Sequence, residues 1–397
     1  MRNGNSSFAL RMKILRSTHT VNPARGGPIE SIKQSSAALQ RRGHEVEIIS
    51  LDAPNDPWVR DAPVPVHALG PGRGSYGYAA RFSSWITERR VQFDAVIVHG
   101  LWQYSSFGVW RALAGTSTPY FVFPHGMLDP WFKRTYPAKH FKKLLYWPWA
   151  EYRVLRDAAA VLFTAEEERR LARESFALYR CREVVVNYGT AAPGNLDQAR
   201  EKFLAAYPQL QARPFLLFLG RLHEKKGCDL LIKGFIALRK SNPDFAPSLV
   251  MAGPCANDEY LRYLRTLANE AGDSILFPGM LTGDIKWGAL SAAEAFVLPS
   301  HQENFGIAVV EALACGIPVL ISNKINIWRE IEADGAGYVE NDDLAGTSDL
   351  FSRWLATPAE TRARMQQNAR RSFANRFEIE RATDSLLAVL AAHAKHP

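Results

Sequence analysis

Short apolar runs alternate with longer amphipathic segments along most of the chain. In the first half, stretches with helical spacing such as 29–42 and 166–176 separate apolar runs of strand length. These runs are Met12–Ser17, Val46–Leu51, Ala95–His99, Tyr120–Phe123, Val161–Thr164 and Val184–Val186. The pattern returns in the second half, with runs at Phe215–Leu219, Leu249–Ala252, Ile275–Phe277, Ala295–Pro299 and Val319–Ser322. Such alternation is typical of parallel sheets covered on both faces, so it predicts an α/β protein with two Rossmann-like, doubly wound domains facing across a cleft.

A break in this pattern falls at 188–214, which is rich in glycine and proline and holds no strand-like run. A chain of 397 residues also exceeds what one hydrophobic core usually supports. We therefore predict an N-terminal domain at 1–190, a linker at 191–213, a second Rossmann-like domain at 214–345 and a helical C-terminal segment at 346–397. Because open parallel sheets bind ligands at the carboxyl ends of their strands, functional residues are expected in the loops that follow strands.

The composition, with 47% hydrophobic and 22% charged residues, is that of a soluble globular protein and excludes disordered and fibrous classes. The four cysteines show no metal-binding spacing, and no apolar run approaches a membrane span or a signal peptide, so a cytoplasmic protein is expected. Residues 1–190 carry 26 Lys and Arg against 16 Asp and Glu, whereas the remainder carries 22 against 24. The excess positive charge of the first half indicates an anionic partner or a solvated basic surface.

The first candidate for chemistry is the loop 220–227, directly after the run that ends at Leu219. It contains two separated cations, Arg221 and Lys226, and precedes a helix that starts near Cys228. A glycine turn at a helix N-terminus favours a phosphate, and the two cations can neutralise a diphosphate. The alternative is a basic turn that only solvates the start of the helix.

The second candidate is a pair of acids, Glu303 and Glu311, after the run that ends at Pro299. Eight residues of helix rise by about 12 Å, which suits two carboxylates that contact different hydroxyl-bearing parts of one ligand. Between the two acids, at the start of the helix, the chain offers a ligand the backbone N–H groups of Asn304, Phe305 and Gly306. The alternative role of Glu303 is that of an acid at a helix N-terminus, where the helix dipole favours it. The alternative for Glu311 is a residue that faces solvent, but its neighbours are apolar, which favours a partner for its carboxylate.

Two loops of the first half also follow strand-like runs. Residues 22–28 form a glycine turn before a helix and include Gly27. His125 stands at a strand end beside a glycine, and two other strand-end histidines, His19 and His99, compete with it as the functional histidine.

With seven residues between its two acids, and with Arg221 and Lys226 in an earlier loop, the chain resembles the retaining glycosyltransferases of the GT4 family, which have the GT-B fold. The resemblance covers nearly the whole chain and is most specific at 299–316. It implies that Arg221 and Lys226 bind the donor diphosphate. It also implies that Glu311 binds the ribose hydroxyls and that Glu303 binds the hydroxyls of the transferred sugar.

The resemblance extends to the first half. It places the loop of Gly27 near the donor phosphate and the acceptor, and it places His125 near the donor sugar. His125 and Glu303 are therefore the predicted catalytic residues. Donor binding is also assigned to Gly27, Asn304, Phe305 and Gly306. The family commonly has glycine where Asn304 stands, a departure that bears on which sugar is preferred.

Residues 131–156 hold seven cations against one acid and interleave them with aromatic and aliphatic residues. Such a mixture favours a peripheral membrane surface, so an anionic membrane is one candidate partner. Nucleic acid is the rival, but no recognised nucleic-acid motif accompanies the patch and no such partner is predicted. The alternative without a partner is a core helix with a basic outer face.

The predicted activity is retaining transfer of a hexose-type sugar from a UDP- or GDP-linked donor to a glycan or a lipid-linked saccharide. Bacterial surface or exopolysaccharide synthesis is the expected context, in the cytoplasm or on the inner face of the membrane. No cofactor and no essential metal are predicted, because the acidic stretch 341–343 lies in a late connection. Two alternatives remain open: a phosphorylase or sugar-nucleotide epimerase of the same fold, and a non-catalytic protein that binds membranes or nucleic acid.

Overall fold

The structure, a computed structural model, describes residues 11–242 and 247–393 and divides into two compact units. Unit 1 comprises Met1–Asn187 with Ile379–Pro397, and unit 2 comprises Tyr188–Glu378. The division differs from the limits predicted from sequence because the last helix, α17 (Ile379–Ala391), belongs to unit 1.

Unit 1 is built on a parallel sheet whose described residues form seven strands in the order β3-β2-β1-β4-β5-β6-β7. The strands are β1 (Lys13–Ser17), β2 (Glu45–Ser50), β3 (Val66–Ala68), β4 (Ala95–His99), β5 (Tyr120–Phe123), β6 (Ala160–Phe163) and β7 (Glu183–Val185). Every residue of the central strand β4 is buried, as expected for a parallel strand with helices on both faces.

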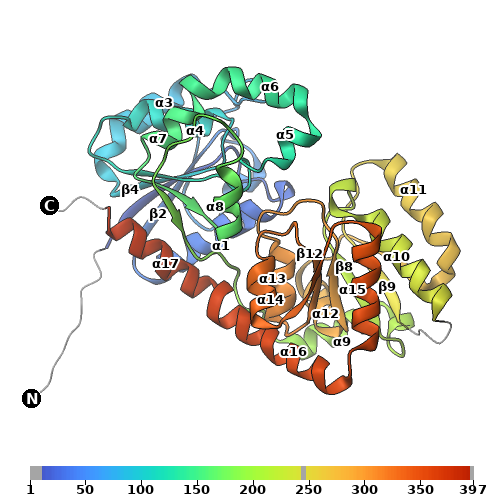
Figure 1. Ribbon diagram of the computed structural model, residues 1–397. Coiled ribbons are helices and arrows are strands. Elements are labelled where there is room, and N and C mark those ends of the chain that lie inside the picture. Colours follow the sequence, from blue (N-terminus) through green and yellow to red (C-terminus); the bar gives the residue numbers. More distant parts are fainter. Residues whose placement is uncertain (1–10, 243–246, 394–397) are drawn as a thin grey trace, which may run out of the picture. The chain divides into compact units, whose positions relative to one another are not determined.

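Helices cover both faces of this sheet (Figure 1). They are α1 (Gly27–Arg41), α2 (Pro57–Arg60), α3 (Ala80–Arg89), α4 (Tyr104–Leu113), α5 (Trp131–Thr135), α6 (Pro137–Tyr146), α7 (Glu151–Arg156) and α8 (Glu166–Ala172). Helix α4 packs against both α3 and α7 over one face, where Phe82, Val109 and Val154 are fully buried with Val96 and Val122 of the sheet. Helix α1 packs against α17 on the other face.

Unit 2 repeats the architecture with strands in the order β10-β9-β8-β11-β12-β13, again all parallel. The strands are β8 (Phe215–Leu219), β9 (Ser248–Ala252), β10 (Ile275–Gly279), β11 (Ala295–Leu298), β12 (Val319–Ser322) and β13 (Gly337–Glu340). In both units the order of strands reverses beside the first strand, and this reversal is the point where ligands bind in doubly wound folds.

The helices of unit 2 fall into two groups, one on each face of the sheet (Figure 1). The first group is α10 (Cys228–Ser241), α11 (Asp258–Ala268) and α15 (Leu344–Ala356). The second is α9 (Leu196–Ala206), α12 (Gly283–Ala292), α13 (Ile307–Ala314), α14 (Trp328–Asp334) and α16 (Ala359–Ser372). Residues 191–213, predicted as a linker, thus contain a helix, and Ala199 and Phe203 of that helix are buried where α9 packs on α12.

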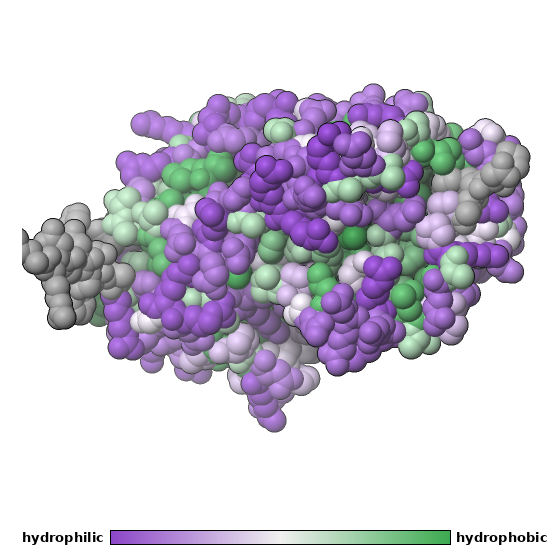
Figure 2. Space-filling model, turned by 90° about the horizontal axis from the view of Figure 1, so that it is seen from below, coloured by the Kyte–Doolittle hydropathy of each residue, from purple (hydrophilic) through white to green (hydrophobic). Residues whose placement is uncertain are grey.

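The surface is mostly hydrophilic on the face shown in Figure 2, where hydrophobic residues appear in separate patches. No helix among residues 11–242 and 247–393 is long and apolar enough to cross a membrane.

Candidate functional site

The loop after β8 lies against the end of β11, and the contact is made at a glycine. Residues Glu224–Lys226 form a single 3₁₀ turn, and Gly227 then takes a left-handed conformation (φ 65°) as the N-cap of α10. A Cβ atom at Gly227 would lie 2.2 Å from the carbonyl oxygen of Pro299. Only glycine fits both the backbone angle and this approach, so the loop is held close to the residues that follow β11.

Hydrogen bonds join the same two loops. The carbonyl of Lys225 accepts the backbone N–H of His301 (2.8 Å) and the hydroxyl of Ser300 (3.0 Å), and Ser300 is fully buried. The two loops that the sequence singled out separately therefore form one structural unit at the carboxyl end of the sheet.

Lys226 and Glu303 form an ion pair between these loops, with 17% and 22% of their side chains exposed. Burial, followed by repulsion from Lys225 and Arg221, lowers the pKa of Lys226 to about 7, while the Glu303 carboxylate favours the charged form. Arg221 is itself exposed to solvent and close enough to act on Lys226. The structure thus gathers three of the four charged residues predicted to hold the donor, and an arriving polyanion would favour the charged form of Lys226.

The residues after Glu303 connect to the loop after β12. Glu303 forms a bridge with Ile325, and the side-chain oxygen of Asn304 accepts from the amide of Asn326 (3.3 Å). Gly306 caps α13 in a left-handed conformation (φ 73°). The unpaired N–H groups at the N-terminus of that helix therefore lie beside Glu303.

Phe305 has a different role from its neighbours, because its side chain belongs to the core. It is 5% exposed, and its ring packs against Tyr188 and Phe377 at centroid distances of 4.9 and 5.8 Å. The residue therefore anchors the loop through its ring, and only its backbone is available to a ligand.

Glu311 lies on α13 and is 6% exposed. Its carboxylate accepts from the ammonium of Lys286 on α12 at 2.8 Å, and 23% of the Lys286 side chain is exposed. The apolar neighbourhood of Glu311 did indicate a partner, and the structure shows Lys286 as one. Lys286 was missed because nothing in the spacing of the sequence relates a residue of α12 to one of α13.

In unit 1, His125 follows β5 with a positive φ of 50°, which is uncommon outside glycine. Its Nε2 lies 3.0 Å from Nδ1 of His99, which ends β4, and the two rings stack at a centroid distance of 5.3 Å. Two of the three competing histidines therefore form one pair. His19 lies in the loop after β1, where a Cβ atom at Gly77 would come within 2.8 Å of its ring.

Burial keeps both histidines uncharged. It lowers the pKa of His125 to about 4, and the buried guanidinium of Arg16 on β1 acts in the same direction. Burial likewise lowers the pKa of His99 well below its usual value, with Arg16 and His125 adding to the effect. At neutral pH the His125 ring is a hydrogen-bonding group without charge.

Glu168 on α8 holds the turn that carries His125. It is 4% exposed, and one of its carboxylate oxygens accepts the backbone N–H of Gly126 (2.7 Å). The other accepts from the backbone and the hydroxyl of Thr164, at 2.8 and 2.7 Å. This role could not be predicted from the sequence, because Glu168 lies in a run of three glutamates and their spacing does not reveal which of them are buried.

Gly27 is the first residue of α1, after Gly26, whose φ is 90°. The loop before it is fixed by Asp52, which follows β2 and is 7% exposed. Its carboxylate accepts the N–H of Val21 (2.9 Å) and the indole N–H of Trp58 (3.0 Å). A buried acid therefore holds the start of the loop that leads to the glycine turn, and the sequence did not indicate this contact.

Two family models match the chain. Residues 26–189 match the glycosyl transferase 4-like domain, and residues 199–372 match glycosyl transferases group 1. Among curated proteins, a D-inositol 3-phosphate glycosyltransferase of Saccharomonospora viridis is 32% identical over 179 residues, which are 43% of this chain and 41% of that protein. The alpha-D-kanosaminyltransferase of Streptomyces kanamyceticus is 27% identical over 61% of this chain and 62% of its own. The chain thus spans less than half the length of the first of these relatives.

Solved structures share the fold over nearly the whole chain. Sucrose-phosphate synthase from Thermosynechococcus elongatus superposes with a TM-score of 0.77 at 20% identity, covering 96% of this chain and 99% of that one. HepE from Anabaena, solved with UDP and glucose, superposes with a TM-score of 0.76 at 16% identity, covering 96% and 100%. Two parallel sheets of this kind, with helices on both faces, are the GT-B fold that these solved structures share. The chain belongs to the GT4 family of glycosyltransferases.

Proposed function

We propose that this protein transfers a hexose-type sugar from a UDP- or GDP-linked donor to a glycan or lipid-linked saccharide acceptor. The observation that carries the proposal is the ion pair of Lys226 and Glu303, with Arg221 nearby, at the carboxyl ends of β8 and β11. HepE, which has the same fold, was solved in complex with UDP-glucose. This likeness supports a nucleotide-sugar as the donor class.

The charges of the site suit loss of a nucleoside diphosphate. Negative charge builds on the leaving diphosphate as its bond to the sugar breaks, and cations already in place stabilise it without reorganisation. Lys226 is partly desolvated, which strengthens its interaction with the leaving group, and Arg221 adds a second charge. Glu303 offers its carboxylate to sugar hydroxyls, and Glu311 offers its own to the ribose.

We propose that the reaction retains the anomeric configuration and needs no metal. The leaving diphosphate assists the acceptor hydroxyl on the same face of the sugar, in keeping with the family resemblance. His125 takes part as a neutral hydrogen-bond partner, because burial and Arg16 disfavour its charged form. Its partner His99 fixes which ring nitrogen is engaged within the pair.

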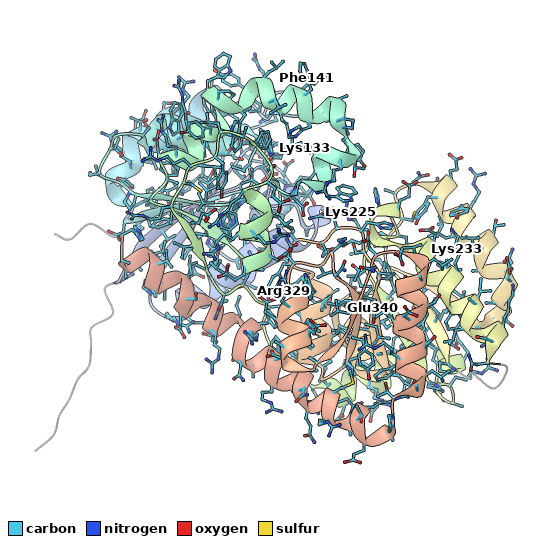
Figure 3. The ribbon with its side chains drawn as sticks, in the orientation of Figure 1. Lys133, Phe141, Lys225, Lys233, Arg329 and Glu340 are labelled. Atoms are coloured by element: carbon cyan, nitrogen blue, oxygen red, sulfur yellow. The ribbon has the colours of Figure 1, made fainter. Side chains whose placement is uncertain are left out.

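Release of UDP or GDP from the corresponding sugar donors is the test of this proposal. The wild type is expected to release one of the two nucleotides in the presence of a saccharide acceptor, and Lys226→Ala is expected to lose this activity. Lys233→Ala is the matched control, because Lys233 lies on α10 and pairs with Asp229 outside the site (Figure 3). Equal activity in Lys226→Ala and Lys233→Ala, or no release by the wild type from any such donor, would overturn the proposal.

We also propose that α5 and α6 rest on an anionic membrane. Helix α6 buries only His140 among its residues, so it is not a core helix. It exposes Phe141 and Leu145, each at 62%, and Trp149 follows at 65%. The exposed cations on the same two helices are Lys133, Arg134, Lys139 and Lys142, and Figure 3 labels Phe141 and Lys133. Apolar side chains ringed by cations match the interface of a bilayer that carries anionic lipids.

Flotation with vesicles tests this surface. Binding to phosphatidylglycerol vesicles is expected to exceed binding to phosphatidylcholine vesicles, and to fall in both Phe141→Ser and Lys142→Glu. The exposed apolar residue Tyr263 of α11 supplies the control Tyr263→Ser, which should bind like the wild type. Binding that is indifferent to Phe141 and Lys142 would contradict the assignment of the surface.

A further inference from the structure

Lys143 is set apart from the other lysines of α6. Lys139 and Lys142 are exposed, whereas Lys143 is half-buried. Its ammonium lies 4.4 Å from the ring centroid of Trp102 and 5.6 Å from that of Phe132. The lysine thus turns away from solvent and toward the loops that follow β4 and β5.

Trp102 stands in that loop after β4 with a positive φ of 69°, which strains a bulky residue. Two contacts hold it there. Its backbone N–H donates to Glu151, which is fully buried (2.8 Å), and its indole N–H donates to the carbonyl of Met127 (3.3 Å). Since Met127 lies two residues after His125, the loop of Trp102 is tied to the loop of the histidine pair.

Lys143 has no ion pair or hydrogen bond among the residues that the structure describes, although it lies within the electrostatic reach of Glu151. Burial lowers the pKa of Lys143 to about 8, and Glu151 opposes this only in part. Burial also raises the pKa of Glu151 to about 7, so this carboxyl is largely uncharged in slightly acidic conditions and repels an anion less. A cation kept partly out of water without a direct counterion is stabilised when an anion binds to it.

We propose that Lys143, over the rings of Trp102 and Phe132, forms a binding site for a phosphoryl group on the acceptor. The aromatic rings leave the ammonium as a point charge, the form in which lysine recognises phosphate. The exposed cations of α5 and α6 raise the local positive potential, which favours a phosphoryl group with two charges over a carboxylate with one. The inference rests on the proposed function, because it assigns the site to the acceptor. The same chemistry fits the headgroup of a lipid-linked saccharide and a free sugar phosphate.

The test follows Lys143 directly by NMR, in protein labelled with ¹³C at the lysine Cε. The Lys143 resonance is identified by its loss in Lys143→Gln. With inorganic phosphate, its titration midpoint is expected to rise by about one pH unit or more, since an adjacent anion favours the charged ammonium. The resonance of the exposed Lys142 on the same helix should not move. The rise must persist in Lys226→Ala, which excludes an effect transmitted from the donor site.

Two further titrations separate the sources of the phosphoryl group. One uses free glucose 1-phosphate and the other uses phosphatidylcholine vesicles that contain a polyprenyl diphosphate. A rise with the first alone assigns a soluble acceptor, and a rise with the second, or with both, assigns a lipid-linked one. A Lys143 midpoint that none of the three probes moves would overturn the inference. Failure of the proposed function appears separately, as a wild type that releases no nucleotide from any donor.

Discussion

Replacement of the buried acid Glu151 by glutamine should make the protein more stable at alkaline pH. Burial raises the pKa of Glu151 from the usual 4.5 to about 7. Its Oε1 accepts both the Trp102 N–H (2.8 Å) and the Ser106 hydroxyl (3.0 Å). The glutamine oxygen in Glu151→Gln can take both of these hydrogen bonds, so the substitution removes the charge and keeps the contacts.

The size and sign follow from the two pKa values. The folded protein keeps a proton on Glu151 that the unfolded chain releases above pH 4.5, so stability falls as pH rises from 4.5 to about 7. The loss is complete above about pH 7 and amounts to at most about 3 kcal/mol, because one pH unit corresponds to about 1.36 kcal/mol. Glu151→Gln lacks this loss. The variant should therefore match the wild type near pH 5 and exceed it at pH 8.

Calorimetric unfolding at pH 5 and pH 8 measures the difference. In a unit of this size, 1 kcal/mol shifts the Tm by about 2–4 °C, so the variant should unfold several degrees higher at pH 8. Glu88→Gln makes the same chemical change on an exposed side chain (66%) and should show no such pH-dependent gap. A Glu151→Gln protein less stable than the wild type at pH 8 would contradict this prediction, and would show instead that the hydrogen bonds from Trp102 and Ser106 favour the charged carboxylate.

Three further outcomes are expected. Lys286→Met should weaken UDP or GDP binding about tenfold, or by about 1.4 kcal/mol, because Glu311 loses the partner that orients it. Calorimetric titration of this variant, of Glu311→Gln and of the double variant should show that the two losses of binding free energy do not add. Simple addition of the two losses would count against the pairing. Glu168→Gln should lower kcat about tenfold or more with little change in the donor KM. The N–H groups of Gly126 and Thr164 donate to different oxygens of Glu168, and a glutamine amide has only one oxygen. An unchanged kcat in steady-state kinetics would contradict this role. Activity should survive treatment with a chelator, and a loss that manganese restores would disprove the metal-independent reaction.

The strands of both sheets were predictable because central parallel strands are buried on both faces. Ala95–His99 and Phe215–Leu219, for example, read as continuous apolar runs and form β4 and β8 with the same limits. The edge strands β3 and β13 were missed, since neither carries a continuous apolar run. The return of α17 to unit 1 was also beyond reach, because the apolar face of a helix does not specify which domain it covers.

The site was predictable only in part, for a related reason. Loops after neighbouring parallel strands meet at one edge of a sheet, so Lys226 and Glu303 were expected to lie near each other. Which side chains pair across helices depends on packing angles and rotamers, which leave no trace in the spacing. The partners Lys286 and Glu168 therefore emerged only from the structure, whereas His99 was already a candidate because it ends a strand.

We propose that unit 2 binds one nucleotide-sugar through Lys226 and Glu303 with Arg221 and Glu311. Calorimetric titration of UDP and GDP into the wild type, Lys226→Ala and the control Lys233→Ala measures this most directly. We expect one molecule of one of the two nucleotides to bind per chain, with equal affinity in the wild type and Lys233→Ala and at least about tenfold weaker binding in Lys226→Ala. Binding of neither nucleotide to the wild type, or equal binding in all three proteins, would contradict this proposal.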